Sequence, residues 1–498
     1  MTGPALFAGP REQFEAITGW LGGPEAAGLT HAGLEDELAT RGRELLRQLL
    51  QGHLDLRAAA EPRLAQVTGA DQVPRARAEA GHSRALATVF GEVTVRRRAY
   101  RAPGAPNLHP ADAALNLPPE KHSHGLRKLA AAESARGSYG QAAAAVSAIT
   151  GTGLGKRQAE QLAGRAAADF AAFYAAARPA PGAAPGDVLV LSADGKGIMM
   201  RPGGLRPAAA RAAARAAPRQ QARLSRGQVG CRKRMAHVGA VYDAAPVPRT
   251  PASILPGTAP REPGTPDGPR ATGKWLTASI TSDAATVISR VFTEAARRDP
   301  RHQRTWIALV DGNPHQITRI RAEATARNTP VTIICDFIHV LEYLWRAAWS
   351  FHPEADPAAG HWVRRHARAI LDGHATTIAA SIRHQAATAT LSHAKRATAA
   401  TTADYLDRKA PYLDYPTALA AGWPIATGII EGACRHLVKD RMDITGARWN
   451  PAGAEAILQL RTLHANGDFN QYWAYHLNQE HNRTHTTRYH NPATPRAA

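Results

Sequence analysis

The sequence predicts an α/β protein built around a mixed sheet, and the order of its segments leads to this fold class. Strand-like apolar segments come first in succession, at 187–194, 232–243 and 273–280. Further strand-like segments at 305–311 and 330–336 then alternate with helical patterns at 284–298 and 315–328. Strands in succession followed by alternating strands and helices are typical of a mixed sheet. A length of 498 residues also exceeds one ordinary core and corresponds to about three domains.

Residues 1–176 are predicted to form a mainly helical N-terminal region. Leucines spaced three and four residues apart over 34–66 indicate an amphipathic helix. Val and Arg alternate around a glycine at 87–102, which favours a short strand or hairpin whose arginines face either solvent or phosphate groups. A stretch rich in Pro, Gly and Ala at 177–186 reads as the linker that ends this region.

Within that region, residues 137–165 have the pattern helix, glycine-containing turn, helix. Ser138 is a suitable cap for the first helix, and the second helix is expected to begin at Lys156. This plan is the one by which helix-turn-helix proteins read DNA, with the start of the second helix in the major groove. Lys156, Arg157 and Gln158 are therefore the expected DNA contacts. A plain helical hairpin is the alternative interpretation.

The charge of the chain points to a polyanionic partner. The formal net charge is +20 and the pI is near 10.4. Lys and Arg side chains that neutralise phosphates release counterions, so such a protein is drawn to nucleic acid, and we expect double-stranded DNA as the partner. The segment from Arg201 to Arg234 contains ten basic and no acidic residues, and is either a DNA-contacting arm or a basic loop. A Pro-rich loop is expected at 246–271.

The cysteines and the N-terminus indicate the compartment. Cys231, Cys335 and Cys434 lie far apart, which argues against a zinc ribbon or a disulfide framework. The N-terminal residues have no basic segment followed by an apolar core, and no apolar run reaches the ~20 residues of a membrane helix. We therefore expect a cytoplasmic protein with no membrane partner.

Two acidic residues are predicted at the ends of separate strands, each followed by glycine. They are Asp194, in SADGKG, and Asp311, in LVDGNPH. Carboxylates at the ends of neighbouring strands converge on one edge of an open α/β sheet. Mg²⁺ prefers such oxygen ligands, and two metal ions can stabilise the attacking and leaving oxygens of a phosphoryl transfer. The alternative for each Asp-Gly pair is a simple turn.

A third carboxylate is provided by Glu431. A helix is expected to begin at Thr427 or Gly428, which puts Glu431 in its first or second turn. Arg435 and Lys439 follow at i+4 and i+8, so we expect both on the same helix face, beside DNA phosphates.

Several motifs in this order resemble those of a known family. The matching segments are SADGKG, KRMAHVGAVY, ALVDGNPHQ, CDFIHVLEYLW and GIIEGACRHLVKDRMDITGARW. Together they resemble bacterial insertion-sequence DDE transposases of the Mutator-like group, whose signature includes a Cys/Asp-x-x-His motif. The resemblance extends from about Phe90 to about residue 475.

The resemblance implies an RNase H-like catalytic domain in two parts, 187–340 and 426–475. A helical insertion at 341–425 separates them, and a solvated basic tail at 476–498 follows. Asp194, Asp311 and Glu431 are implied as the metal-binding triad, with Mg²⁺ or Mn²⁺. Asp336 and His339 are implied as an auxiliary pair that positions the DNA strand or the leaving group.

Three of these assignments have alternatives. Asp336 also ends a strand, so it rivals Asp311 as the second metal ligand. A histidine such as His339, taken alone, is more often a structural helix-capping residue. Trp345 or Trp349 in the insertion either stacks on a flipped base or packs in a core.

The activity implied is that of a transposase in the bacterial cytoplasm, associated with the nucleoid. It would cut the ends of its element and join them to target DNA, as a homo-oligomer when bound to DNA. One alternative is a non-catalytic DNA-binding protein derived from a transposase. The other is an RNase H-like nuclease that cuts but does not join.

Overall fold

The structure, a computed structural model, describes residues 3–176, 182, 184, 186–215, 233–255, 268–444 and 446–490. It divides into two compact units, which comprise residues 1–176 with 467–498, and residues 177–466. Helices and a mixed sheet with parallel and antiparallel strands make up the fold, so the α/β class predicted from the sequence is confirmed.

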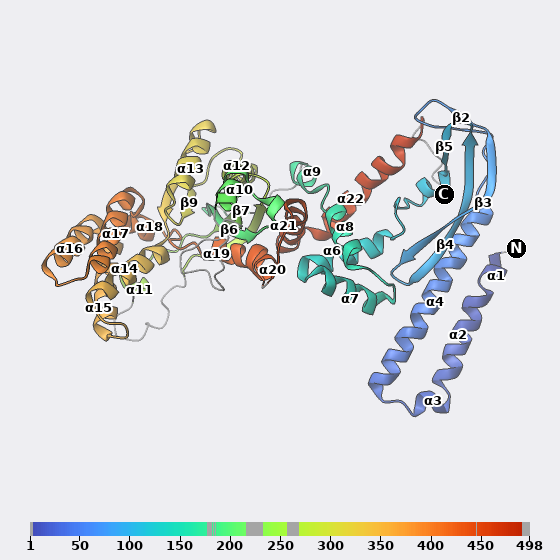
Figure 1. Cartoon of the computed structure of the whole chain (residues 1–498), viewed down its shortest axis with the longest axis horizontal. Coiled ribbons are helices and arrows are strands. Elements are labelled where there is room, and N and C mark those ends of the chain that lie inside the picture. Colours follow the sequence, from blue (N-terminus) through green and yellow to red (C-terminus); the bar gives the residue numbers. More distant parts are fainter. Residues whose placement is uncertain are drawn as a thin grey trace. The chain divides into compact units, whose positions relative to one another are not determined.

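The first unit combines a long helical hairpin, a three-stranded antiparallel sheet and a group of shorter helices (Figure 1). The hairpin contains α1 (Gly3–Leu6), α2 (Ala8–Leu21), α3 (Pro24–Ala27) and α4 (His31–Ala60). The strands are β1 (Val67–Thr68), β2 (Pro74–Arg75), β3 (Arg77–Thr88), β4 (Gly91–Ala102) and β5 (Ala105–Leu108). The remaining helices are α5 (Pro110–Ala114), α6 (His124–Arg136), α7 (Tyr139–Thr150), α8 (Lys156–Ala166), α9 (Phe170–Ala175), α22 (Phe469–Thr484) and η4 (Thr486–Arg488).

Helix α4 packs against strand β4 of the three-stranded sheet. Val93 and Val95 of β4 are buried with Leu54 of α4 in one apolar cluster, as the alternation of Val and Arg predicted. The Gln51 amide accepts a hydrogen bond from Thr94 N at 2.8 Å and donates one to Thr94 O at 3.0 Å. These two bonds tie α4 to the strand. The hairpin β3–β4 is longer than the short strand or hairpin that we expected at 87–102.

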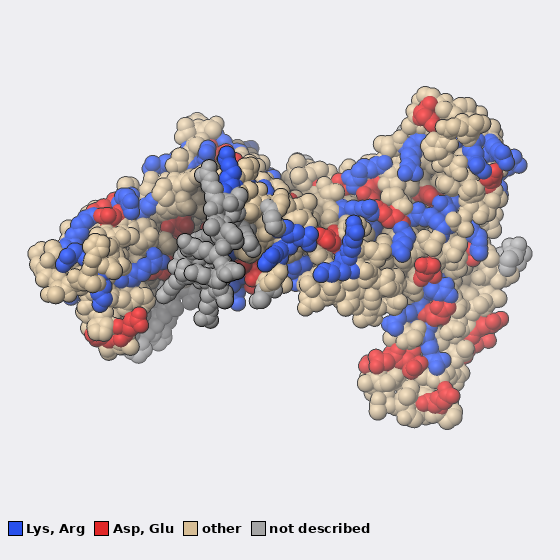
Figure 2. Space-filling model, in the orientation of Figure 1, with Lys and Arg blue, Asp and Glu red and all other residues tan. Residues whose placement is uncertain are grey.

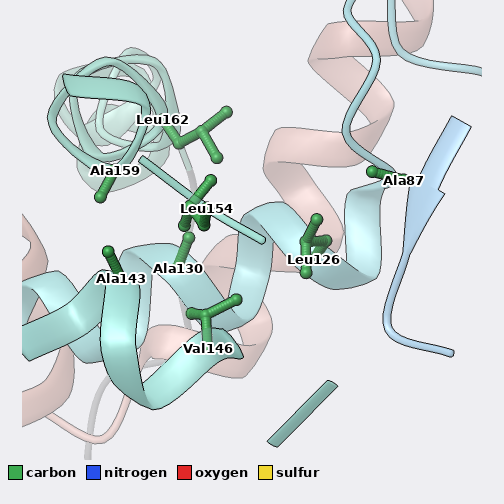
Figure 3. Packing of buried hydrophobic residues seen from close by; sticks show 8 residues of the cluster. All are labelled: Ala87, Leu126, Ala130, Ala143, Val146, Leu154, Ala159 and Leu162. Atoms are coloured by element: carbon green, nitrogen blue, oxygen red, sulfur yellow. The ribbon is translucent and has the colours of Figure 1, made fainter. Parts of the chain in front are cut away.

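Helices α7 and α8 lie where the helix-turn-helix pattern predicted two helices. Ser138 caps α7 by accepting from Gln141 N at 3.2 Å, while the Gln141 side chain accepts from Ser138 N, which completes a capping box. Gly151 ends α7 with φ 67°, a conformation that favours glycine. A core of small and branched apolar residues holds α6, α7 and α8 together, and Figure 3 shows Leu126, Val146 and Leu162 pointing into it.

Residues 476–490 differ from the solvated basic tail that we expected over 476–498. They continue helix α22 through Thr484, and His476 is fully buried. Nδ1 of His476 lies 2.7 Å from Oδ2 of Asp169, and Arg483 donates to both oxygens of the same carboxylate. Because these polar side chains pair with one another, a segment that looks solvated from its composition packs inside the first unit.

The second unit is built on a five-stranded sheet with the order β10-β9-β6-β7-β8. The strands are β6 (Val188–Met199), β7 (Lys233–Ala244), β8 (Ala271–Ser279), β9 (Trp306–Val310) and β10 (Thr332–Cys335). Strands β6, β7 and β8 are antiparallel neighbours, whereas β9 runs parallel to both β6 and β10. This is the predicted succession of strands followed by alternation with helices.

Helices cover both faces of this sheet. Helix α12 (Ala284–Arg298) lies against one face, where a Cβ on Gly239 of β7 would come within 2.4 Å of Val291. Helix α19 (Gly428–Ala433) and the π-helical turn η3 (Cys434–Lys439) contact β6 and β7. The other connecting elements are η1 (Pro202–Gly204), α10 (Pro207–Arg215), α11 (Pro251–Ile254), α13 (Pro314–Ala326), α20 (Asp440–Met442) and α21 (Pro451–Ala465).

The segment predicted as a helical insertion, 341–425, is helical in the structure, and its helices gather beside β9 and α13 in Figure 1. They are α14 (Phe337–Phe351), α15 (Pro357–Leu371), α16 (Ala375–Thr388), α17 (His393–Lys409), η2 (Ala410–Tyr412) and α18 (Tyr415–Ala420). Residues 216–232 of the basic segment and residues 256–267 of the Pro-rich loop lie outside the described residues.

Candidate functional site

The register of the parallel strands aligns three aspartates at one end of the sheet. The parallel pairing of β6 with β9 ends at Ser192, which lies opposite Leu309, so Asp194 and Asp311 each follow the last paired residue of their strand by two positions. Cys335 of β10 lies opposite Val310, and Asp336 and Asp311 each follow these paired residues by one position. Asp194, Asp311 and Asp336 thus follow the ends of the parallel pairing on three neighbouring strands, and we call them the aspartate row.

Asp194 does not end its strand, which corrects the prediction from the sequence. Strand β6 continues to Met199 because it stays paired with β7 after its pairing with β9 stops at Ser192. Asp194 therefore lies just beyond the point where the parallel part of the sheet ends. Asp311 and Asp336, by contrast, directly follow the last residues of β9 and β10, as predicted.

The Asp194 side chain is held by the turn that follows helix α19. Its Oδ2 accepts a hydrogen bond from Sγ of Cys434 at 3.3 Å, and its Oδ1 accepts from Gly195 N at 2.6 Å. Burial raises the pKa of the Cys434 thiol, and the negative charges of Asp194 and Glu431 raise it further. Cys434 is therefore a neutral donor beside two of the three predicted acids. The sequence indicated no role for this residue at the site.

Asp336 is buried, with 1% of its surface exposed, and both oxygens of its carboxylate accept hydrogen bonds. Oδ1 accepts from Ile338 N at 3.0 Å and from Thr427 N at 3.3 Å, and Oδ2 accepts from the Thr427 hydroxyl at 2.7 Å. Burial raises the pKa of Asp336, and the nearby charge of Glu431 adds to the rise, against the lowering effect of the hydrogen bonds from Thr427 and Ile338.

Glu431 lies in the first turn of α19, where the sequence predicted it. The residue is exposed at the surface, and its Oε1 lies 3.0 Å from the Thr427 hydroxyl. Thr427 thus stands between Asp336 and Glu431. Threonine before a helix is a common capping residue, and that is the only signal for Thr427 in the sequence.

The predicted alignment of Arg435 and Lys439 with Glu431 relied on regular α-helical spacing. The structure instead has a π-helical turn at Cys434–Lys439, whose hydrogen bonds join residues five apart. The i+4 and i+8 positions therefore do not continue the row from Glu431. Arg435 and Lys439 are both exposed, and Nε of Arg435 lies 3.8 Å from Oδ1 of Asp440.

Asp311 is half-buried, and its carboxylate accepts fewer hydrogen bonds than that of Asp336. Its Oδ1 accepts from Asn313 N at 2.8 Å. Burial raises the pKa values of Cys335 and Tyr405, and the negative charge of Asp311 raises both a little further. Both side chains therefore lie near Asp311. Gly312 follows with φ +90°, and a Cβ there would come within 3.2 Å of the Tyr405 hydroxyl. Only glycine suits this turn.

His339 lies in the first turn of α14 among aromatic rings. Its ring meets those of Tyr343 and Tyr405 edge to face, with centroids 5.3 and 6.0 Å away. Its Nδ1 is 3.4 Å from Oε2 of Glu342. Tyr343 and Tyr405 stack on each other with centroids 3.9 Å apart. Over the described part of the chain, no hydrogen bond or ion pair joins His339 or the Asp311 side chain to Asp194, Asp336 or Glu431.

The donor chemistry suits a hard divalent cation, since the aligned groups are carboxylates. Among the described residues, however, no group of three or more His, Cys, Asp or Glu side chains is close enough together to hold a metal ion. The residue types thus fit Mg²⁺ or Mn²⁺, and assignment of Asp194, Asp311 and Glu431 as ligands is a proposal.

The predicted DNA contacts on α8 divide into two kinds. Lys156 and Arg157 are exposed in the first turn, and neither forms an ion pair within the described segments. The Gln158 side chain accepts a hydrogen bond from Gly155 N at 2.9 Å, so it caps its own helix.

In the insertion, Trp345 and Trp349 are 37% and 46% exposed, with ring centroids 5.9 Å apart, so neither is a core residue.

The helical hairpin of the first unit has a different surface character. Figure 2 shows acidic side chains gathered at the end of the hairpin where α3 joins α2 and α4, and Glu25, Glu35, Asp36 and Glu37 belong to those elements. Like charge repels the DNA backbone, so this end of the hairpin is not a candidate for phosphate contact.

No protein-family model matches this chain, and no curated protein sequence matches it. Of the described helices, none is both long enough and apolar enough to cross a membrane.

Proposed function

We propose that the chain is the transposase of a bacterial insertion sequence, a DDE enzyme of the Mutator-like group. The observation that carries the proposal is the hydrogen bond from Cys434 to Asp194, which ties the strand that carries Asp194 to the segment that carries Glu431. In support, Asp194 and Asp311 both follow the paired residues of the neighbouring parallel strands β6 and β9. In this proposal the five-stranded sheet is an RNase H-like core, and the nucleoid of the bacterial cytoplasm is the place of action.

Asp194, Asp311 and Glu431 would hold Mg²⁺ or Mn²⁺. A divalent cation held there would lower the pKa of a water molecule and would neutralise charge on the scissile phosphate. The protein's own part is alignment. Cys434 orients the Asp194 carboxylate through its hydrogen bond, and the exposed Arg435 and Lys439 follow Glu431 in the chain, where they can pair with DNA phosphates.

DNA recognition is assigned to the first unit. Lys156 and Arg157 project from the first turn of α8, the position from which a recognition helix reaches base edges and phosphates. The N-terminus of a helix also attracts phosphate through its free backbone N–H groups. Because both ends of an element must be cut together, we propose that the chain acts on double-stranded DNA as a homo-oligomer.

The test uses the purified full chain, duplexes that carry the inverted repeats flanking the gene, and Mg²⁺. We expect cleavage at the repeat end and joining of a pre-cleaved end to a second duplex. Asp194→Asn, Asp311→Asn and Glu431→Gln should each abolish both steps. Asp372→Asn is the matched control, since Asp372 is a surface residue at the end of α15 with its nearest cation 3.7 Å away.

Three outcomes would contradict the proposal in different ways. Specific binding of the repeat without cleavage would indicate a non-catalytic DNA-binding protein. Cleavage without joining of the pre-cleaved end would indicate a nuclease. Cleavage that persists in the Glu431→Gln variant would remove Glu431 from the triad.

A further inference from the structure

Asp336 and Asp311 occupy neighbouring positions of the aspartate row, but their carboxylates have different surroundings. Asp336 is 1% exposed and accepts three hydrogen bonds, two from backbone N–H groups and one from a hydroxyl. Asp311 is half-buried, and its side chain accepts one hydrogen bond, from Asn313 N. A carboxylate has about four lone-pair positions, so Asp336 has little capacity left for another ligand, whereas Asp311 keeps most of its capacity.

The three bonds to Asp336 connect the starts of two helices. Ile338 N belongs to the first turn of α14, for which Asp336 is the N-cap. Thr427 is the residue before α19, and both its N–H and its hydroxyl donate to Asp336. The backbone strengthens the connection, since Phe337 N donates to Ile425 O at 2.9 Å. One buried carboxylate therefore fixes where α19 begins.

The position of Glu431 follows from that of Thr427. Glu431 N donates to Thr427 O at 3.1 Å, which is the first helical hydrogen bond of this turn. The Thr427 hydroxyl also lies 3.0 Å from Oε1 of Glu431. The backbone of Glu431 is thus held through the residue that Asp336 anchors, and its carboxylate lies beside the same hydroxyl.

We propose that Asp336 is a positioning residue that acts through Thr427 to hold Glu431 in place, and that Asp311 is the second metal ligand. The inference rests on the proposed function. It assigns to Asp336 a role on the third acid of the triad, in place of a role on the DNA strand or leaving group.

Two substitutions at position 336 separate positioning from ligation. In Asp336→Asn the amide oxygen still accepts from Ile338 N and Thr427 N, and the amide nitrogen donates to the Thr427 hydroxyl, which then donates to Glu431. Asp336→Ala removes all three bonds. A metal-binding aspartate tolerates neither change, because Asn has lost the charge and one hard oxygen donor.

The experiment measures Mn²⁺ binding by the full chain, from the loss of the free-ion electron paramagnetic resonance signal, together with repeat-end cleavage. We expect Asp336→Asn and Thr427→Ser to stay within about threefold of the unsubstituted protein, because both keep the link to Glu431. Asp336→Ala and Thr427→Val should weaken both readouts by about 10- to 100-fold, the usual cost of losing a partner behind a metal ligand. Asp311→Asn should abolish both.

Hydrogen exchange provides a readout that does not depend on metal. Asp336→Ala should speed exchange in peptides that cover residues 425–433, and Asp311→Asn should leave it unchanged. Peptides from α6 to α8, in the first unit, report whether each variant is folded.

The results distinguish the failure of this inference from the failure of the proposed function. Loss of Mn²⁺ binding in Asp336→Asn equal to that in Asp311→Asn would make Asp336 a ligand and overturn the inference. Unaltered exchange at 425–433 in Asp336→Ala would overturn the anchoring role. If the unsubstituted chain neither binds Mn²⁺ nor cleaves, the proposed function is wrong and the metal assignment fails with it, while exchange at 425–433 still decides whether Asp336 anchors α19.

Discussion

Sγ of Cys434 lies 3.3 Å from Oδ2 of Asp194 and donates a hydrogen bond to it across the gap between the π-helical turn η3 and the central strand β6. Cys434 is buried, and burial holds the pKa of its thiol well above the ordinary value, so the sulfur keeps its proton. π-helical turns are rare and frequently mark functional sites. Here the turn brings a donor to the acid that we propose as a metal ligand.

Replacement of Cys434 tests this contact. Cys434→Ser keeps a proton donor, so we expect cleavage of repeat-end DNA close to that of the unsubstituted protein. Cys434→Ala leaves Asp194 without this partner, and we expect a loss of about tenfold, at the low end of the usual cost for such partners. Cleavage rates at saturating Mg²⁺ measure the effect. Equal rates for Ala and the unsubstituted protein would show that the thiol only fills space.

The two exposed cations at the start of α8 lead to a prediction about salt. Each phosphate contact contributes about −0.9 to the slope of log K against log salt concentration for duplex DNA. The double variant Lys156→Ala, Arg157→Ala should therefore bind repeat DNA more weakly, with a slope less steep by about two contacts. Binding measured by fluorescence anisotropy at several salt concentrations checks this.

Arg11→Ala is the matched control for that measurement, since Arg11 is an exposed cation on α2 of the acidic hairpin. Its affinity and slope should equal those of the unsubstituted protein. An unchanged slope in the Lys156, Arg157 double variant would place the DNA-binding surface elsewhere.

Gln158 leads to a prediction about stability rather than about DNA sequence. Its side chain accepts from Gly155 N and so satisfies a backbone donor that the helix itself leaves free. Gln158→Ala should lower the free energy of unfolding of the first unit by about 1 kcal/mol, the typical value of a helix cap. Gln158→Glu keeps the acceptor oxygen, so the free energy of unfolding should stay close to that of the unsubstituted protein. Hydrogen exchange in peptides from α8 measures the stability of both variants. Faster exchange in the Gln158→Glu variant than in the Gln158→Ala variant would contradict the capping role.

Much of the fold could be predicted from local sequence, because apolar runs and helical periodicity are local. The predicted helix 284–298 has the bounds of α12, and Asp311 and Asp336 follow their strands as expected. The extension of β6 past Asp194 could not be predicted, since Gly195 and Gly197 have low strand propensity and only pairing with β7 keeps them extended.

The parts of the candidate site that sequence did not reveal depend on contacts between distant segments. Thr427 acquires its role from Asp336, which lies 91 positions earlier in the chain. Cys434 acquires its role from a π-helical turn, for which no residue pattern was evident. Likewise, His476 looked solvated because its partner Asp169 is remote in sequence. Composition identifies which residues are polar, but tertiary pairing decides which of them are buried.

Buried histidines in the first unit make its stability depend on pH. The ring of His476 is 0% exposed, and burial lowers its pKa although the neighbouring Asp169 and Glu480 oppose the change. Burial also lowers the pKa of His124 to about 4, and the positive charge of Arg127 contributes. A histidine whose pKa is lower in the folded state contributes stability that is present above its unfolded pKa, about 6.5, and is lost as pH falls through the folded value.

We therefore expect the first unit of the full chain to lose stability as pH falls from about 6.5 towards 4, the interval between the unfolded and folded pKa values of His124. Urea unfolding at pH 7.5, 6 and 5, followed by hydrogen exchange in α6 and α22, measures the loss. His124→Gln keeps a donor for Asn116 O, at 2.8 Å from the ring Nε2, and removes one titrating group, so its midpoint should fall less over the same range. His31→Gln is the control, since that histidine's side chain is 86% exposed and its replacement should change nothing. A midpoint of the unsubstituted chain that is constant from pH 7.5 to 5 would show that these rings accept protons without cost to the fold.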